Sequence, residues 1–173
     1  NLLNELKEYV EKSPSDNFDF EYGQIVPYGE LLSTLLVSSY LNEAGINNKL
    51  FDARDLIITN NHYRDAEVNW DLTGQNIHDV IMPYLSRRQK GKIAITQGFI
   101  ARTVDYKSTT LGREGSDYSA AIFAYALDAE EVVIWKDVPG ILNADPKYFS
   151  ETKKLDSISY TEAIELSYYG ATI

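Results

Sequence analysis

The stretch IAITQGFI, residues 93–100, decides how the fold of this chain is interpreted. It is a nearly continuous apolar run that ends around a glycine, Gly98. Such runs are typical of strands that are buried on both faces of a parallel sheet, where helices cover each side. Residues 132–135, VVIW, have the same character and predict a second buried strand. Residues 118–127 lie between the two runs and predict a helix, so helix and strand alternate.

Further helices and strands are predicted outward from this centre. Three segments repeat apolar residues at helical spacing: residues 1–12, 29–42 and 76–85. Pro83 should kink the third of these. Residues 49–52 predict a strand, residues 56–59 fit a strand or a helix, and Ser159 with Glu162 predicts a capped last helix. The pattern indicates an α/β fold, a three-layer αβα sandwich with a mainly parallel central sheet, and we expect residues 1–173 to form one domain.

The composition excludes several classes of protein. The chain has 173 residues, of which 44% are hydrophobic, which is enough to bury a core. A formal net charge of -10 and a pI near 4.6 argue against nucleic acid or an anionic membrane as the main partner. The chain has no cysteine and two histidines, His62 and His78, which we expect at the surface, and no residue is assigned to a metal. Because no apolar run approaches a membrane span and the N-terminus lacks a signal-peptide pattern, we expect a cytoplasmic protein.

The stretch TTLGREGSDYSAA, residues 109–121, carries the strongest indication of a binding site. Its glycines, including Gly115, permit close approach of the backbone, and Ser116 is expected to cap a helix that begins near Asp117. The N–H groups of a first helical turn bind anions, and the fork of Arg113 fits a carboxylate or a phosphate. A turn that only begins a helix remains the alternative interpretation.

Other charged residues follow predicted strands or begin predicted helices. Glu30 lies in the first turn of the second helical segment, where it either complements the helix dipole or holds an ammonium group of a substrate. Lys136 and Asp137 follow the run at 132–135, at the end of the strand where ligands bind in such sheets, and Lys147 comes shortly after. Asp52 and Arg54 are predicted to form a structural ion pair.

Taken together, these stretches resemble the aspartate kinases, which are members of the amino-acid kinase superfamily. The matching segments are GEL at 29–31, FDAR at 51–54, TQGFI at 96–100, TTLGR at 109–113, GSDY at 115–118, DVPGI at 137–141 and DP at 145–146. They occur in the order found in the family, and the combination is much more specific than any single segment.

The resemblance implies phosphorylation of the β-carboxylate of L-aspartate by ATP, with Mg²⁺, to give 4-phospho-L-aspartate. This is the first step towards lysine, threonine and methionine. By the same resemblance Glu30 would contact the amino group of aspartate and Arg113 its α-carboxylate, and Gly115 would also belong to the substrate site. Ser116 and Asp117 would lie where the substrate meets the γ-phosphate. We also expect the full-length protein to be a homo-oligomer.

The resemblance places a second group of residues at the nucleotide. Lys136 and Asp137 would border ATP, Lys147 would lie near its phosphates, and Leu142 stands where many members have a tyrosine near the base. Thr172 similarly stands where many members have a nucleotide-binding lysine. Glu114 replaces a glycine that is usual in the family, which puts an acid beside the predicted anion site.

The resemblance also implies segments that this sequence does not contain. Members begin with a Lys-Phe-Gly-Gly strand and loop, whose lysine stabilises the transferred phosphoryl group, and end in regulatory ACT domains. We therefore expect this chain to be an incomplete catalytic domain that is inactive alone. Two alternatives stay open: another amino-acid kinase, acting on acetylglutamate or glutamate, and a catalytically silent ligand-binding domain of the same fold.

Overall fold

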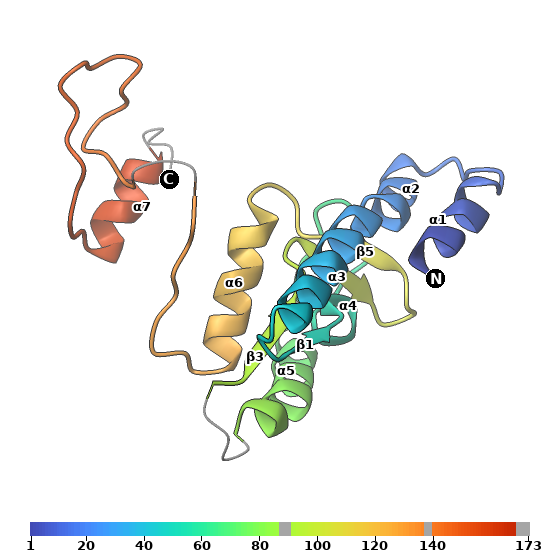
Figure 1. The fold of residues 1–173 in the computed structure, drawn as a ribbon. Helices are drawn as coiled ribbons and strands as arrows, with labels where there is room; N and C mark the ends of the chain where they lie inside the picture. The colour runs from blue at the N-terminus through green and yellow to red at the C-terminus, as the bar shows by residue number, and fades with distance from the viewer. Residues whose placement is uncertain (87–90, 137–139, 169–173) are drawn as a thin grey trace. The chain divides into compact units, whose positions relative to one another are not determined.

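A computed structural model of the protein describes residues 1–86, 91–136 and 140–168 (Figure 1). The chain divides into two compact units, residues 1–132 and residues 133–173. In the described part of the chain, no helix combines the length and the apolar character needed to cross a bilayer.

The helices of the first unit largely follow the predicted pattern. They are α1 (Leu2–Val10), α2 (Phe18–Ile25), α3 (Pro27–Glu43), α4 (Ala53–Leu56), α5 (Trp70–Leu85) and α6 (Gly115–Ala126). α2 was not predicted; it begins where the side chain of Asn17 accepts a hydrogen bond from the backbone of Phe20. Asn69 caps α5 in the same way, so this helix begins six residues earlier than the apolar spacing predicts, and it contains Pro83 near its end.

The strands of the first unit pair mainly in parallel. They are β1 (Asn48–Phe51), β2 (Ile58–Thr59), β3 (Ile93–Thr96), β4 (Ile100–Thr103) and β5 (Ser108–Thr110). β1 pairs with β3 and β2 with β4 in parallel, whereas β4 and β5 are antiparallel. The run at 93–100 therefore forms two strands joined by residues 97–99 rather than one. The ambiguous segment at 56–59 contains the end of α4 and the whole of β2.

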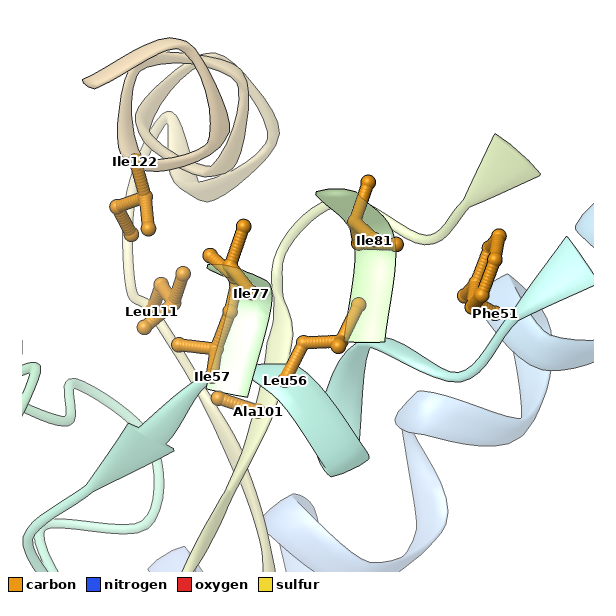
Figure 2. Close-up of a cluster of buried hydrophobic side chains, with 8 residues drawn as sticks. All are labelled: Phe51, Leu56, Ile57, Ile77, Ile81, Ala101, Leu111 and Ile122. Atoms are coloured by element: carbon orange, nitrogen blue, oxygen red, sulfur yellow. The ribbon is translucent and has the colours of Figure 1, made fainter. Parts of the chain in front are cut away.

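The core lies on both faces of these strands. Ile100 and Ala101 are consecutive on β4 and fully buried, and because successive side chains of a strand point to opposite faces, they join different clusters. Ile100 packs with Leu31 of α3. Ala101 belongs to the larger cluster of Figure 2, to which α5 contributes Ile77 and Ile81 and α6 contributes Ile122. The other members of this cluster are Phe51, Leu56, Ile57 and Leu111. Helices thus lie on both faces of β4, in agreement with the predicted αβα arrangement.

One predicted strand is not formed, and β3 is less buried than predicted. Residues 132–135 are exposed and irregular, and Trp135 is 91% exposed. A buried strand needs neighbouring strands for its backbone N–H and C=O groups, and no strand in the described residues pairs with this run. Ile93 at the start of β3 is also exposed, and in the described part of the chain β3 pairs with β1 alone.

The second unit is held by short-range backbone contacts. Leu142 forms an isolated antiparallel bridge with Lys154, flanked by hydrogen bonds between Asn143 and Lys153 and between Leu155 and Ile141. The predicted last helix is present as α7 (Tyr160–Tyr168). Its capping box is formed as predicted: the backbone N–H of Glu162 donates to the Ser159 hydroxyl, and the Glu162 carboxylate accepts from the backbone N–H of Ser159.

Candidate active site

The amino end of α6 differs in detail from the prediction. The helix begins at Gly115, its N-cap is Glu114, and no side chain caps it, so Ser116 is inside the first turn and does not cap it. Glu114 adopts the left-handed conformation, with φ at 54°, which favours glycine. The glycine usual at this position in the resembled family therefore has a conformational reason. Ser116 is exposed and Asp117 is half-buried.

The loop at residues 97–99 lies directly against this first turn. A Cβ atom on Gly98 would lie 3.0 Å from the Cα atom of Ser116, so only glycine fits without displacement. Phe99 also has a positive φ, 70°. Its N–H donates to the hydroxyl of Ser119 at 2.8 Å, and this hydroxyl donates to the carbonyl of Gly115 at 2.8 Å. The loop at 97–99 and the first turn of α6 are therefore packed and hydrogen-bonded together.

The same loop reaches the amino end of α3 through a buried amide. Gln97 is 2% exposed, and its Oε1 accepts a hydrogen bond from the backbone N–H of Ala53 at 2.8 Å. Its Nε2 donates to the hydroxyl of Thr34 at 2.8 Å. The Thr34 hydroxyl in turn donates at 2.7 Å to the carbonyl of Glu30, in the first turn of α3. The backbone at Glu30 is thereby connected to the loop that contacts Ser116.

Arg113 is exposed to solvent, in contrast to the buried Gln97. Its side chain is 94% exposed, and its Nε lies 3.8 Å from the Glu114 carboxylate. Arg113 and Gly112 line an open cavity of about 530 Å³ together with residues of α2 and of the segment from 61 to 65. Gly112 has φ at 72°, and a Cβ there would overlap the carboxylate of Asp65. The predicted residues Glu30, Ser116 and Asp117 do not line this cavity.

The predicted ion pair of Asp52 and Arg54 is confirmed. Arg54 donates to the Asp52 carboxylate from Nη2 at 2.7 Å and from Nε at 3.0 Å. This hydrogen bonding raises the pKa of Arg54 above its usual value. Asp52 also caps α4, since it accepts from the backbone of Arg54. His62 and His78 are exposed, as predicted.

The residues assigned to the nucleotide belong to the second unit. Lys136 and Lys147 are exposed, and the backbone N–H of Lys147 donates to the Asp145 side chain at 2.8 Å. Leu142 is half-buried at the bridge with Lys154. Asp137 and Thr172 lie outside the described residues. Among the described positions, Lys147 and Leu142 thus make their contacts within the second unit.

The structure places Gly115 and Ser116 against the loop at 97–99 and links the backbone carbonyl of Glu30 to this loop through Thr34. The loop was predicted as part of a motif, but no role was predicted for Gln97, Thr34 or Ser119. Thr34 shares its helix face with the polar residues Glu30 and Ser38, and Ser119 shares its face with Ser116, so no sequence pattern singled them out. Each meets the loop from its own helix.

This fold and site define a class of protein. Mainly parallel strands packed between helices define an α/β protein, and the amino end of a helix with a loop packed against it is the kind of place where such proteins bind anionic ligands. The model of the amino acid kinase family matches residues 4–173. The chain belongs to this family.

Comparisons with individual proteins point to one branch of the family. Lysine-sensitive aspartokinase 3 of Escherichia coli is 39% identical over 150 residues, which are 87% of this chain and 32% of the relative. The bifunctional aspartokinase/homoserine dehydrogenase of Buchnera aphidicola is 37% identical, over 86% of this chain and 18% of the relative. The chain thus spans about a third or less of these relatives.

Solved structures agree with the sequence comparisons. The crystal structure of E. coli aspartokinase III in complex with aspartate and ADP matches 98% of this chain, and 37% of its own, with a TM-score of 0.86 and 36% identity. The aspartate kinase of Synechocystis matches 98% of this chain, and 26% of its own, with a TM-score of 0.68 and 28% identity. Isopentenyl phosphate kinase, at 17% identity and a TM-score of 0.53, shares the fold.

Proposed function

We propose that this chain forms part of the catalytic domain of an aspartate kinase, which transfers the γ-phosphoryl group of ATP to the β-carboxylate of L-aspartate. The observation that carries the proposal is the loop at 97–99, which contacts the first turn of α6 and is linked by hydrogen bonds to the first turn of α3. Glu30 and Ser116 lie in these two turns. The similarity to an aspartokinase crystallised with aspartate and ADP supports the choice of substrates.

The acceptor side has groups suited to an amino acid. A carboxylate at Glu30 attracts an ammonium group, and the guanidinium of Arg113 matches a carboxylate with two parallel hydrogen bonds. The N–H groups at the start of α6 favour negative charge near Ser116 and Asp117. In the proposed reaction a β-carboxylate oxygen of aspartate forms a bond to the γ-phosphorus. The bond from that phosphorus to the bridging oxygen breaks, and ADP leaves with the electron pair.

The nucleotide side is proposed to consist of Lys136, Asp137, Leu142 and Lys147. Exposed lysines suit phosphates as point charges. Among the described residues, no group of three His, Asp or Glu side chains is arranged to hold a metal ion. This is compatible with Mg²⁺ held mainly by phosphate oxygens, with one or two carboxylates. When bound with ATP, Mg²⁺ supplies neutralisation of the charge on the phosphates.

The test of the proposal is an assay of the natural full-length protein. ADP formation should require L-aspartate and Mg²⁺ and should produce one acyl phosphate for each ADP, trapped as the hydroxamate with hydroxylamine. Acetylglutamate and glutamate serve as competing acceptors, and a preference for either would replace the aspartate assignment with another amino-acid kinase. Absence of turnover, together with aspartate or nucleotide binding in calorimetry, would favour the silent ligand-binding domain.

Two further properties of the full-length protein remain part of the proposal. We propose a cytoplasmic location and a homo-oligomer, and the acidic charge of -10 supports a protein that does not bind nucleic acid. Light scattering of the purified full-length protein measures its mass. A monomeric mass at working concentrations would contradict the proposed oligomer.

A further inference from the structure

We infer that the loop at 97–99 is a spacer that sets the distance between the two halves of the acceptor site, through two matching hydroxyl relays. Thr34 and Ser119 are its positioning residues. The inference rests on the proposed function, because it assumes that the first turns of α3 and α6 together bind one acceptor molecule. It adds the residues that decide how far apart these turns are held.

The first relay joins the loop to α3. The side chain of Gln97 donates to the Thr34 hydroxyl at 2.8 Å, and that hydroxyl donates at 2.7 Å to the carbonyl of Glu30, four residues earlier in the helix. The other end of the Gln97 amide is fixed by the backbone N–H of Ala53. Gln97 is 2% exposed, so water does not readily replace these bonds. The turn that carries Glu30 is therefore tied to the loop.

The second relay joins the loop to α6 with the same geometry. The backbone N–H of Phe99 donates to the Ser119 hydroxyl at 2.8 Å, and that hydroxyl donates at 2.8 Å to the carbonyl of Gly115, also four residues earlier. Ser119 is 2% exposed. The carbonyl of Phe99 accepts from the N–H of Leu111 at 2.8 Å. Both backbone polar groups of Phe99 are therefore hydrogen-bonded to the segment that contains Arg113 and Ser116.

The loop itself has little room to adjust. A Cβ on Gly98 would lie 3.0 Å from the Ser116 Cα, and a Cβ on Gly115 would lie 2.7 Å from a ring carbon of Phe99. Three consecutive residues thus contact α3 at one end and α6 at the other. A ligand that bridges an acid on α3 and a cation before α6 meets two turns whose backbones are held by these contacts, and a fixed separation of the turns favours one acceptor length over another.

Steady-state kinetics of the natural full-length protein test the inference. Thr34→Val keeps the side-chain shape and removes the relay, and it should raise the KM for aspartate roughly tenfold while the KM for ATP stays within about twofold. Thr34→Ser restores a hydroxyl and should recover most of the loss. Ser33→Ala is the matched control, because the exposed Ser33 hydroxyl also donates to the Glu30 carbonyl, at 3.2 Å, but makes no hydrogen bond to Gln97.

The outcomes separate the inference from the function on which it rests. If wild type shows no aspartate-dependent turnover, the proposed function fails. The relay is then tested by hydrogen exchange, in which Thr34→Val, but not Ser33→Ala, should speed exchange of the Phe99 amide. An unchanged aspartate KM in Thr34→Val with active wild type, equal effects on both substrates, or the same loss in Ser33→Ala would overturn the inference. Unchanged Phe99 exchange would overturn it in an inactive protein.

Discussion

The two groups of candidate site residues are held by contacts of different range. Around the loop at 97–99, the decisive hydrogen bonds join residues far apart in the chain, such as Gln97 with Thr34 and with Ala53. In the second unit the bonds span shorter stretches: those near Lys147 and at the start of α7 join residues two or three positions apart, and the bond between Lys153 and Asn143, beside Leu142, joins residues ten positions apart. Site geometry that rests on long-range contacts depends on the folded core, whereas local contacts persist in a short segment. Substitutions in the two regions should therefore have different consequences.

The largest expected effect is a loss of substrate binding with no loss of fold stability. Arg113→Ala should lower kcat/KM for aspartate by about 100-fold, because a charged hydrogen bond to a carboxylate contributes up to ~3 kcal/mol. The melting temperature should stay unchanged, since the side chain is 94% exposed. Steady-state kinetics with aspartate and ATP measure kcat/KM, and a thermal melt measures the melting temperature. Arg113→Lys retains the charge and should recover part of the loss; aspartate saturation like that of wild type in Arg113→Ala would remove Arg113 from the site.

The next substitution acts on a long-range contact. Gly98→Ala should destabilise the fold by about 1–3 kcal/mol, because the new methyl overlaps the first turn of α6. Activity should fall with it, since Ser116 must move. Gly74→Ala is the control, because Gly74 lies in α5 with open space where a Cβ would be added. This substitution should stabilise the protein by about 0.5–1 kcal/mol. Chemical denaturation measures both; equal stability of the two variants would contradict the tight packing at Gly98.

A smaller effect is expected from local strain at the start of α6. Glu114→Gly should stabilise the protein by about 1 kcal/mol, because Glu114 adopts a left-handed backbone conformation that is unfavourable in free energy for residues with a Cβ. Glu114→Ala is the matched control, since it removes the same carboxylate but keeps the Cβ and should give no gain. Denaturation of the pair distinguishes backbone strain from charge. A gain in both variants would assign the effect to the carboxylate beside Arg113.

The smallest effect tests the local contacts of the second unit. Hydrogen bonds from Ser159 lower the pKa of Glu162 below its ordinary value of 4.5. A lowered pKa in the folded state stabilises α7 above the ordinary carboxyl pKa, and this contribution is lost as the pH falls through the folded-state pKa. NMR carbon shifts of residues 160–166 should report reduced helicity in acid. Glu162→Gln should show no such titration. If its pH profile were identical to that of wild type, the capping box would be excluded as the source of the titration.

The sequence predicted those elements whose information is local. α1, α3 and α7 follow from apolar spacing or a capping box, and the Asp52–Arg54 pair follows from its position after a strand. The run at 132–135 was wrongly predicted as a buried strand, because a strand depends on partners elsewhere in the chain. Its composition alone does not specify them.

The candidate site was predicted as a motif but not as a geometry. Residues 109–121 indicated an anion site, yet Glu114 rather than Ser116 is the N-cap, a choice made by the backbone conformation. The roles of Gln97 and Ser119 depend on the packing of α3 and α6 against one loop. No spacing along the chain encodes such a contact between two helices.

The aromatic residues also provide an optical probe of this region. The chain has two tryptophans, one in each unit: Trp70 packs edge-to-face against Tyr118 and Tyr125 of α6, whereas Trp135 is 91% exposed. Tyr118 directly follows Asp117, so the Trp70 indole reports on the first turn of α6. In this sequence Trp135→Phe would leave Trp70 as the one tryptophan, beside the proposed acceptor site, and with selective excitation of tryptophan a titration with aspartate could be followed by its fluorescence without labelling.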